Sequence, residues 1–144
     1  MSKVWWMALV LLATCCCGGP HSKYPVVKAD GPRVKILLKD VRDGQVHFFS
    51  FVSGKKSLDF FVRMDGADKL HTCFDACFTC NKFKKGYRVD GTDLVCNECG
   101  TKFRLADETW KDVMGCVPIA IASVVEGDYL TLAVVDIQRG EKLF

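Results

Sequence analysis

The sequence is poor in the side chains that acid–base catalysis uses most. Histidine accounts for only 3 of its 144 residues, and two of these, His47 and His71, fall in the part of the chain that we expect to fold. The sequence contains no nucleophile motif and no glycine-rich phosphate loop. It also lacks a C-x-x-C-H segment, which excludes covalently attached haem. We therefore predict that the protein is not an independent enzyme.

Most of the chain carries no net charge. The formal net charge is +3 at pH 7, and the excess comes from Lys3, Lys23, Lys28 and Arg33, which precede residue 34 with only Asp30 against them. From residue 34 onward acidic and basic residues are equal in number. Nucleic-acid binding needs clustered cations that neutralise phosphates. The charge pattern therefore argues against a nucleic-acid partner.

No apolar run approaches the length of a membrane-spanning helix, which needs about 20 residues. The N-terminus has Lys3 followed by about ten apolar residues, Val4 to Ala13, which is the pattern of a signal peptide. Leu12 to Cys15 resembles a lipobox, in which Cys15 would be lipidated. We interpret residues 1–17 as an export segment and expect a periplasmic or cell-surface lipoprotein attached to a membrane through its N-terminus. Simple secretion and an uncleaved anchor remain alternatives.

The remaining chain divides into a tether and one domain. Residues 18–33 are rich in glycine and proline, which predicts a tether without a core of its own. Residues 34–144 show period-two alternation with turn residues between the runs, which predicts a compact, mostly β, antiparallel domain. A cysteine-rich insert like a zinc ribbon or rubredoxin is expected at 71–117. The strands are expected at 34–39, 46–51, 58–63, 118–125 and 129–135, with a final edge at 135–137 and 140–144.

Cysteine is the residue that the sequence has in excess, with 9 copies. Three of them, Cys15 to Cys17, belong to the export segment. Two C-x-x-C pairs follow, Cys77 with Cys80 and Cys96 with Cys99, and this spacing lets one tight turn direct both sulfurs to the same point. Two facing turns of this kind form a tetrahedral cage of four sulfurs. The pairs predict a metal or cluster site, and a disulfide framework, which an exported protein permits, is the alternative.

The spacing alone does not separate zinc from iron, because both accept four thiolates. Six cysteines converge on the insert, which is more than one zinc ion can use. Cys73-x-x-x-Cys77-x-x-Cys80 also has the spacing by which radical enzymes hold a four-iron cluster, although this chain is too short to be such an enzyme. We therefore expect a [4Fe–4S] cluster, with zinc or a single iron as alternatives. Cys73, Cys116 and His71 are candidate further ligands.

The ordered motifs F-D-A-C-x-x-C, G-Y, C-x-x-C-G and G-C-x-P also carry a family resemblance. In these motifs, and over nearly all of 34–144, the sequence resembles the FtrD-like membrane iron–sulfur family. The resemblance implies an iron–sulfur protein that works beside high-affinity iron permeases and other periplasmic redox components. The matching positions are Cys77, Cys80, Cys96, Cys99 and Cys116, whereas Cys73 departs from the pattern. The multi-span membrane portion of many members does not occur in these residues.

Two functions follow from these expectations. The first is one-electron transfer to a redox protein or a membrane iron-transport complex, with Lys82, Lys84 and Lys85 either as a docking rim or as a solvated charge run. A variant of this function is a homo-oligomer in which several copies of the chain stack their clusters into a conducting assembly. The second function is a zinc-stapled β module that binds a partner or handles metal ions, which would be colourless and would unfold with chelator.

Overall fold

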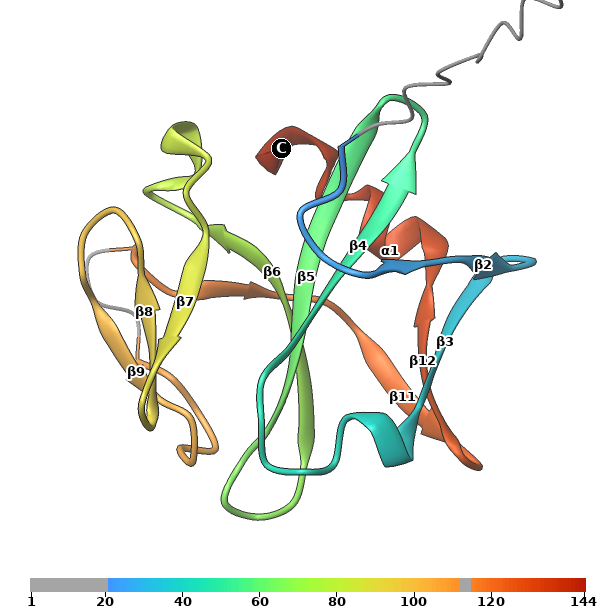
Figure 1. Ribbon diagram of the computed structural model, residues 1–144, viewed down its shortest axis with the longest axis horizontal. Helices are drawn as coiled ribbons and strands as arrows, with labels where there is room; N and C mark the ends of the chain where they lie inside the picture. Colours follow the sequence, from blue (N-terminus) through green and yellow to red (C-terminus); the bar gives the residue numbers. More distant parts are fainter. Residues whose placement is uncertain (1–20, 112–114) are drawn as a thin grey trace, which may run out of the picture.

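The computed structural model describes residues 21–111 and 115–144. The export segment predicted at 1–17, with the lipidation predicted at Cys15, lies outside the described residues. Three β-sheets make up most of the fold, as the sequence predicts, and their pairings are antiparallel except for one short parallel pair (Figure 1). None of the described helices has the length and apolar character needed to cross a membrane.

The first sheet has five strands in the order β1-β4-β5-β6-β10. Its strands are β1 (Val26–Val27), β4 (His47–Ser53), β5 (Lys56–Met64), β6 (Leu70–Cys77) and β10 (Pro118–Ala120). The second sheet has the order β11-β12-β3-β2, with β11 (Ser123–Glu126), β12 (Tyr129–Ala133), β3 (Arg33–Leu37) and β2 (Ala29–Asp30). The third sheet consists of β7 (Tyr87–Asp90), β8 (Asp93–Cys96) and β9 (Lys102–Arg104).

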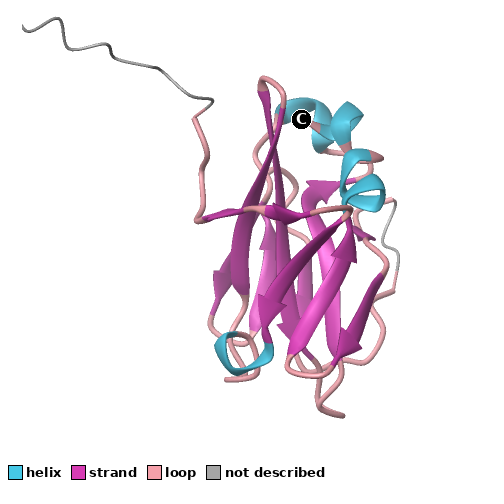
Figure 2. Cartoon of the chain, turned by 90° about the vertical axis from the view of Figure 1, so that its right-hand side faces the viewer, coloured by secondary structure: helices cyan, strands magenta, loops and turns pink. Residues whose placement is uncertain are grey.

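The helical segments are short. They are η1 (Leu38–Asp40), η2 (Asn81–Phe83), α1 (Val134–Gln138) and η3 (Glu141–Leu143). Figure 2 shows the strands running side by side, with most of the helical turns at the end where the C-terminus lies.

Two apolar cores lie on opposite faces of the first sheet, because successive side chains of a strand point to opposite faces. Phe60 packs into the larger core, which β3, β5 and β12 share, and its neighbour Phe61 packs into a second core with Tyr87, Leu94 and several cysteines. The third sheet covers this second core. The cysteines therefore lie between the third sheet and the face of β5 and β6 that carries Phe61.

The boundary of the predicted insert differs from the structure. We expected the insert to begin at residue 71, but β6 continues through Cys77 as a strand that pairs with β5 and β10. Cys73 therefore belongs to the five-stranded sheet. The apolar run predicted as one strand at 118–125 is divided into β10 and β11, which belong to different sheets.

The predicted final edge at 135–137 and 140–144 is wrong. These residues form α1 and η3, and β12 already ends at Ala133. A strand would place Val135 and Ile137 on the same face, whereas Val135 is 57% exposed and Ile137 is fully buried. A helical turn instead directs Val134 and Ile137 together into the larger core.

The segment predicted as a tether contributes to the fold from Tyr24 onward. The amide of Tyr24 donates to Ser50 Oγ at 3.1 Å, and the amide of Ser50 donates to the Pro25 carbonyl at 2.9 Å. β1 and β2 then pair with β4 and β3. The composition is typical of a linker, but tertiary contacts recruit these residues as edge strands.

Candidate metal centre

The first cysteine turn begins where β6 ends. Cys77 is the last residue of β6, and the amide of Cys80 donates to the Cys77 sulfur at 3.4 Å. Such amide-to-sulfur bonds stabilise a thiolate and orient it towards a metal. The amide of Thr79 donates to the Gly115 carbonyl at 3.3 Å, which joins this turn to the segment that carries Cys116.

The second cysteine turn begins at the end of β8 with Cys96. The amide of Cys96 donates to the Thr101 carbonyl at 3.0 Å, and the amide of Gly100 donates to the Cys96 carbonyl at 2.9 Å. Gly100, the residue after this pair, has φ +75°, a left-handed conformation that glycine adopts without strain. Cys96 is buried and Cys99 is exposed.

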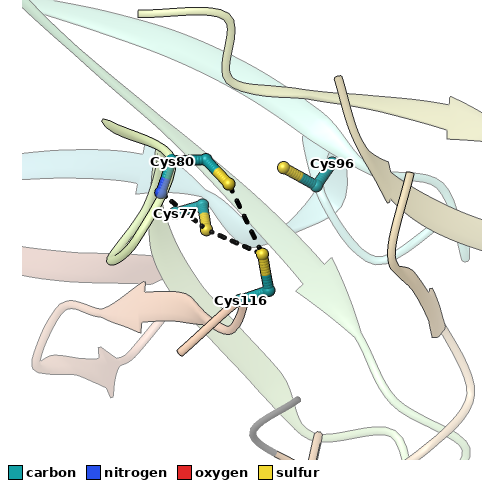
Figure 3. Close-up of side chains that lie close together, drawn as sticks. All are labelled: Cys77, Cys80, Cys96 and Cys116. Carbon is teal, nitrogen blue, oxygen red and sulfur yellow. Dashed lines mark hydrogen bonds between the residues drawn. The ribbon is translucent and has the colours of Figure 1, made fainter. Parts of the chain in front are cut away.

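Four sulfurs come together at one place. Those of Cys77, Cys80, Cys96 and Cys116 all lie within 4.8 Å of one another (Figure 3). The Cys116 sulfur is 3.4 Å from that of Cys77 and 3.5 Å from that of Cys80. The Cys99 sulfur lies 2.8 Å from that of Cys116, on the exposed side of the group. The structure therefore gathers five of the six cysteines predicted as ligands.

The donor set fits a metal group held by thiolates. A single ion with metal–sulfur bonds of about 2.3 Å in tetrahedral geometry has its sulfurs about 3.8 Å apart. The separations around Cys116 are close to this value. A four-iron cube has its irons and sulfides between the ligands, so its cysteine sulfurs stand farther apart than those on one ion.

Crowding of the thiols favours a bound cation. Burial raises the pKa of Cys80 to about 12, and the nearby Cys77 and Cys99 thiols add to this shift. Burial, with the surrounding thiols, also raises the pKa of Cys116. Adjacent thiolates repel one another, so these groups cannot all ionise without a positive charge between them. Metal binding would therefore release protons, and affinity would rise with pH.

Cys99 differs from the buried thiols. Burial alone would raise its pKa, but hydrogen bonds with Cys116 and Thr101 outweigh that effect and lower the pKa to about 6. Its sulfur lies 3.2 Å from Thr101 Oγ1. Cys99 is thus a thiolate near neutral pH that borders the four-sulfur group.

Cys73 and His71 lie away from this group. Cys73 is four residues before Cys77 on the same strand, about 13 Å away at 3.3 Å per residue. Its partners across the sheet are Phe61 and Ala120, and burial raises the pKa of its thiol to about 12. His71 Nε2 lies 2.5 Å from Asp65 Oδ2 at the turn between β5 and β6.

Asp75 connects the region of the first cysteine turn to segments that are distant in the sequence. Its buried carboxylate accepts hydrogen bonds from the Tyr87 amide at 2.6 Å, from the Tyr24 hydroxyl at 2.8 Å and from Lys23 Nζ at 3.0 Å. A Cβ atom on Gly86 would lie 2.5 Å from this carboxylate, which explains the glycine of the G-Y motif. Lys23 and Tyr24 gave no signal because they lie in the segment predicted as a tether.

Tyr87 is a buried neighbour of the sulfurs. Its side chain is only 2% exposed, and its hydroxyl has no hydrogen-bond partner among the described residues. Burial, together with the charge of the nearby Cys77, raises the pKa of Tyr87. The hydroxyl therefore stays protonated and adds an unpaired buried dipole beside Cys77.

Comparison with known proteins points to the same chemistry. Residues 41–144 match a family described as "Membrane iron-sulfur containing protein FtrD-like". A comparison with curated proteins found no match. The matched range includes every cysteine of the sulfur group.

Proposed function

The chain belongs to the FtrD-like family of membrane iron–sulfur proteins, and on this basis we propose that it is an electron carrier with an iron centre held by cysteine thiolates. The observation that carries the proposal is the gathering of Cys77, Cys80, Cys96 and Cys116 within 4.8 Å. A thiolate-ligated iron centre supplies one-electron redox chemistry. His71, the histidine nearest to these cysteines in the sequence, pairs with Asp65 instead.

The protein's own residues bind and shield the centre. Cys77, Cys80, Cys96 and Cys116 would hold it, with Cys99 as a fifth thiol at its exposed side. The Cys80 amide donates to Cys77, which lowers the negative charge on that sulfur and makes reduction easier. Phe61, Leu94 and Phe103 belong to the same buried cluster and exclude water from one side. Low exposure of this kind is one determinant of the reduction potential.

The type of centre has two candidates. A [4Fe–4S] cluster agrees with the family description and with the number of cysteines. A single ion, either iron as in rubredoxin or a structural zinc, agrees with the close spacing of the sulfurs around Cys116. If the ion is zinc, the site has a structural role and cross-links the third sheet to the first. The protein would then act by binding a partner.

We further propose that the protein acts outside the cytoplasm, attached to a membrane through residues 1–17 with lipidation at Cys15. The family description as a membrane protein supports this location. The physiological partner would then be a redox protein or a membrane iron-transport complex. No substrate conversion by the chain itself is proposed.

Metal analysis of anaerobically purified protein tests the proposal. Iron, zinc and acid-labile sulfide are measured, together with the visible spectrum before and after dithionite. Iron with stoichiometric sulfide and a bleachable band indicates a cluster, whereas iron without sulfide indicates a single-iron site. One zinc per chain with no colour contradicts electron transfer and leaves the zinc-stapled module.

A further inference from the structure

The segment that contains the first cysteine turn has an unusual charge pattern. Residues 76–89 contain Lys82, Lys84, Lys85 and Arg88 and no acidic residue. Lys85 pairs with Glu98 at 2.6 Å. Among the described residues, no carboxylate forms an ion pair with Lys82 or Lys84. This segment therefore presents positive charge to solvent, although the domain as a whole is balanced.

Two aromatic side chains are exposed in the same segment. Phe78, between the two cysteines of the first turn, is 70% exposed, and Phe83 is 49% exposed. Lys82 Nζ lies 5.0 Å from the centre of the Phe83 ring. Phe78 also borders a groove of about 520 Å³ that continues along Ile119 and Leu143. Exposed aromatics beside an apolar groove are typical of a protein interaction site.

This surface gives access to the sulfurs. A narrow crevice of about 50 Å³ is lined by Cys77, Cys80 and Cys96 together with Lys84 and Lys85. Leu143 borders both this crevice and the groove beside Phe78, so the two are adjacent. Figure 1 shows the η2 turn and the C-terminal turn at the same end of the molecule. A protein bound at this end would lie directly over the sulfur group.

We propose that this surface, defined by Phe78, Phe83, Lys82, Lys84 and Lys142, is the docking site for an acidic electron-carrier protein. The inference rests on the proposed function and names the class of partner. Exposed aromatic side chains can serve as buried anchors of an interface, and a cationic rim around them is complementary to an acidic partner. The rim charges speed association, and the exposed rings gain burial when the complex forms.

A second copy of the chain fits the surface less well. A twofold contact would place the same patch on both subunits, so the lysines of one copy would face those of the other. Like charges brought together in this way disfavour association. The lysine-rich rim thus selects against self-pairing and in favour of carboxylates.

Binding of an acidic flavodoxin to the full chain tests the inference. Chemical-shift titration is performed with zinc-loaded protein, which reports docking without any redox step, and stopped-flow electron transfer is performed with the protein as isolated. The test variant combines Lys82→Glu with Lys84→Glu. The matched control combines Lys39→Glu with Lys69→Glu, two exposed lysines on η1 and on the turn before β6, so net charge changes equally.

The expected result is at least a tenfold loss of flavodoxin affinity in the test variant, near wild-type affinity in the control, and weakening with added salt. Phe83→Ser should weaken binding without changing its salt dependence. Equal losses in both double variants, or tighter binding of a basic cytochrome c than of flavodoxin, would overturn the inference, as would a dimer that Lys82→Glu dissociates. If flavodoxin binds but the isolated protein transfers no electrons, the proposed function fails while the docking surface stands.

Discussion

The sulfur of Cys116 lies 3.4 Å from the sulfur of Cys77, although the two residues are 39 positions apart in the sequence. The sheet produces this contact, because Pro118 on β10 is the register partner of Cys77 on β6. Cys116, two residues before Pro118, is thereby held over the first cysteine turn. The predictions below follow from this arrangement and from the residues around it.

Cys116 and Cys99 are the two candidates for the fourth ligand beside Cys77, Cys80 and Cys96, and replacement of Cys116 should reduce metal binding more. We expect Cys116→Ser to lower metal affinity at least tenfold, because this sulfur contacts three others, and Cys99→Ser to lower it less, because Cys99 is exposed. Metal content and chelator competition measure both effects. Cys73→Ala serves as the control and should keep its metal. A larger loss for Cys99→Ser than for Cys116→Ser would assign the fourth ligand position to Cys99.

Removal of the Tyr87 hydroxyl should change the electronic properties of the centre and leave the fold intact. Tyr87→Phe removes the buried hydroxyl dipole beside Cys77, and a thiolate that loses nearby polar groups makes reduction harder. We expect a more negative reduction potential and a shifted sulfur-to-metal absorption band, measured by redox titration of the iron form. Tyr129→Phe, at an exposed tyrosine, should leave the potential at its wild-type value. An unchanged potential in Tyr87→Phe would mean that Tyr87 only packs.

Alanine substitutions at Gly86 and Gly91 should destabilise the protein to different extents, because only Gly86 lies against another side chain. Gly86 and Gly91 have nearly the same φ, +61° and +62°, but a Cβ on Gly86 would lie 2.5 Å from the Asp75 carboxylate, whereas a Cβ on Gly91 meets nothing within 4 Å. Alanine at either position must adopt a left-handed backbone conformation, which lowers the free energy of unfolding by about 1 kcal/mol. We expect Gly86→Ala to cost about 1–3 kcal/mol more, as overpacked sites do. Urea unfolding of both variants gives the difference, and equal costs would show that Asp75 moves aside freely.

The turn between β5 and β6 should be sensitive to acid. Burial alone would raise the pKa of Asp65, but hydrogen bonds from His71 and from the Lys69 and Ala67 amides lower it to about 2. Because the folded pKa lies below the ordinary value of 3.8, this carboxylate stabilises the protein at pH values above about 4. That contribution is lost as the pH falls from about 4 towards 2.

Asp65→Asn tests this dependence. Loss of these hydrogen bonds should cost about 1–3 kcal/mol of unfolding free energy at pH 6. The difference between wild type and variant should shrink as the pH approaches 2, as measured by urea unfolding across the range. Metal release in acid affects both proteins and cancels in the comparison. A difference that stays constant with pH would contradict the assigned pKa.

Several strands could be predicted from the pattern of neighbouring residues alone. Period-two alternation located β3, β4 and β5 to within two residues at each end, because a strand with a buried face leaves that pattern locally. The prediction was less successful at the C-terminus, where Val134, Val135 and Ile137 fit both a strand and a helical turn. Their exposure decided between the two, and exposure depends on what packs above them.

The positions of the two C-x-x-C turns were likewise evident from the sequence, since two intervening residues form one tight turn and Gly100 permits the left-handed φ after the second pair. Only the tertiary structure decided how the remaining cysteines divide. Cys73 and Cys116 both flank the turns in the sequence, but strand geometry carries Cys73 about 13 Å from Cys77, while the pairing of β10 with β6 brings Cys116 into contact. Strand register is a long-range property, set by the sheet as a whole, so spacing along the chain could not reveal it.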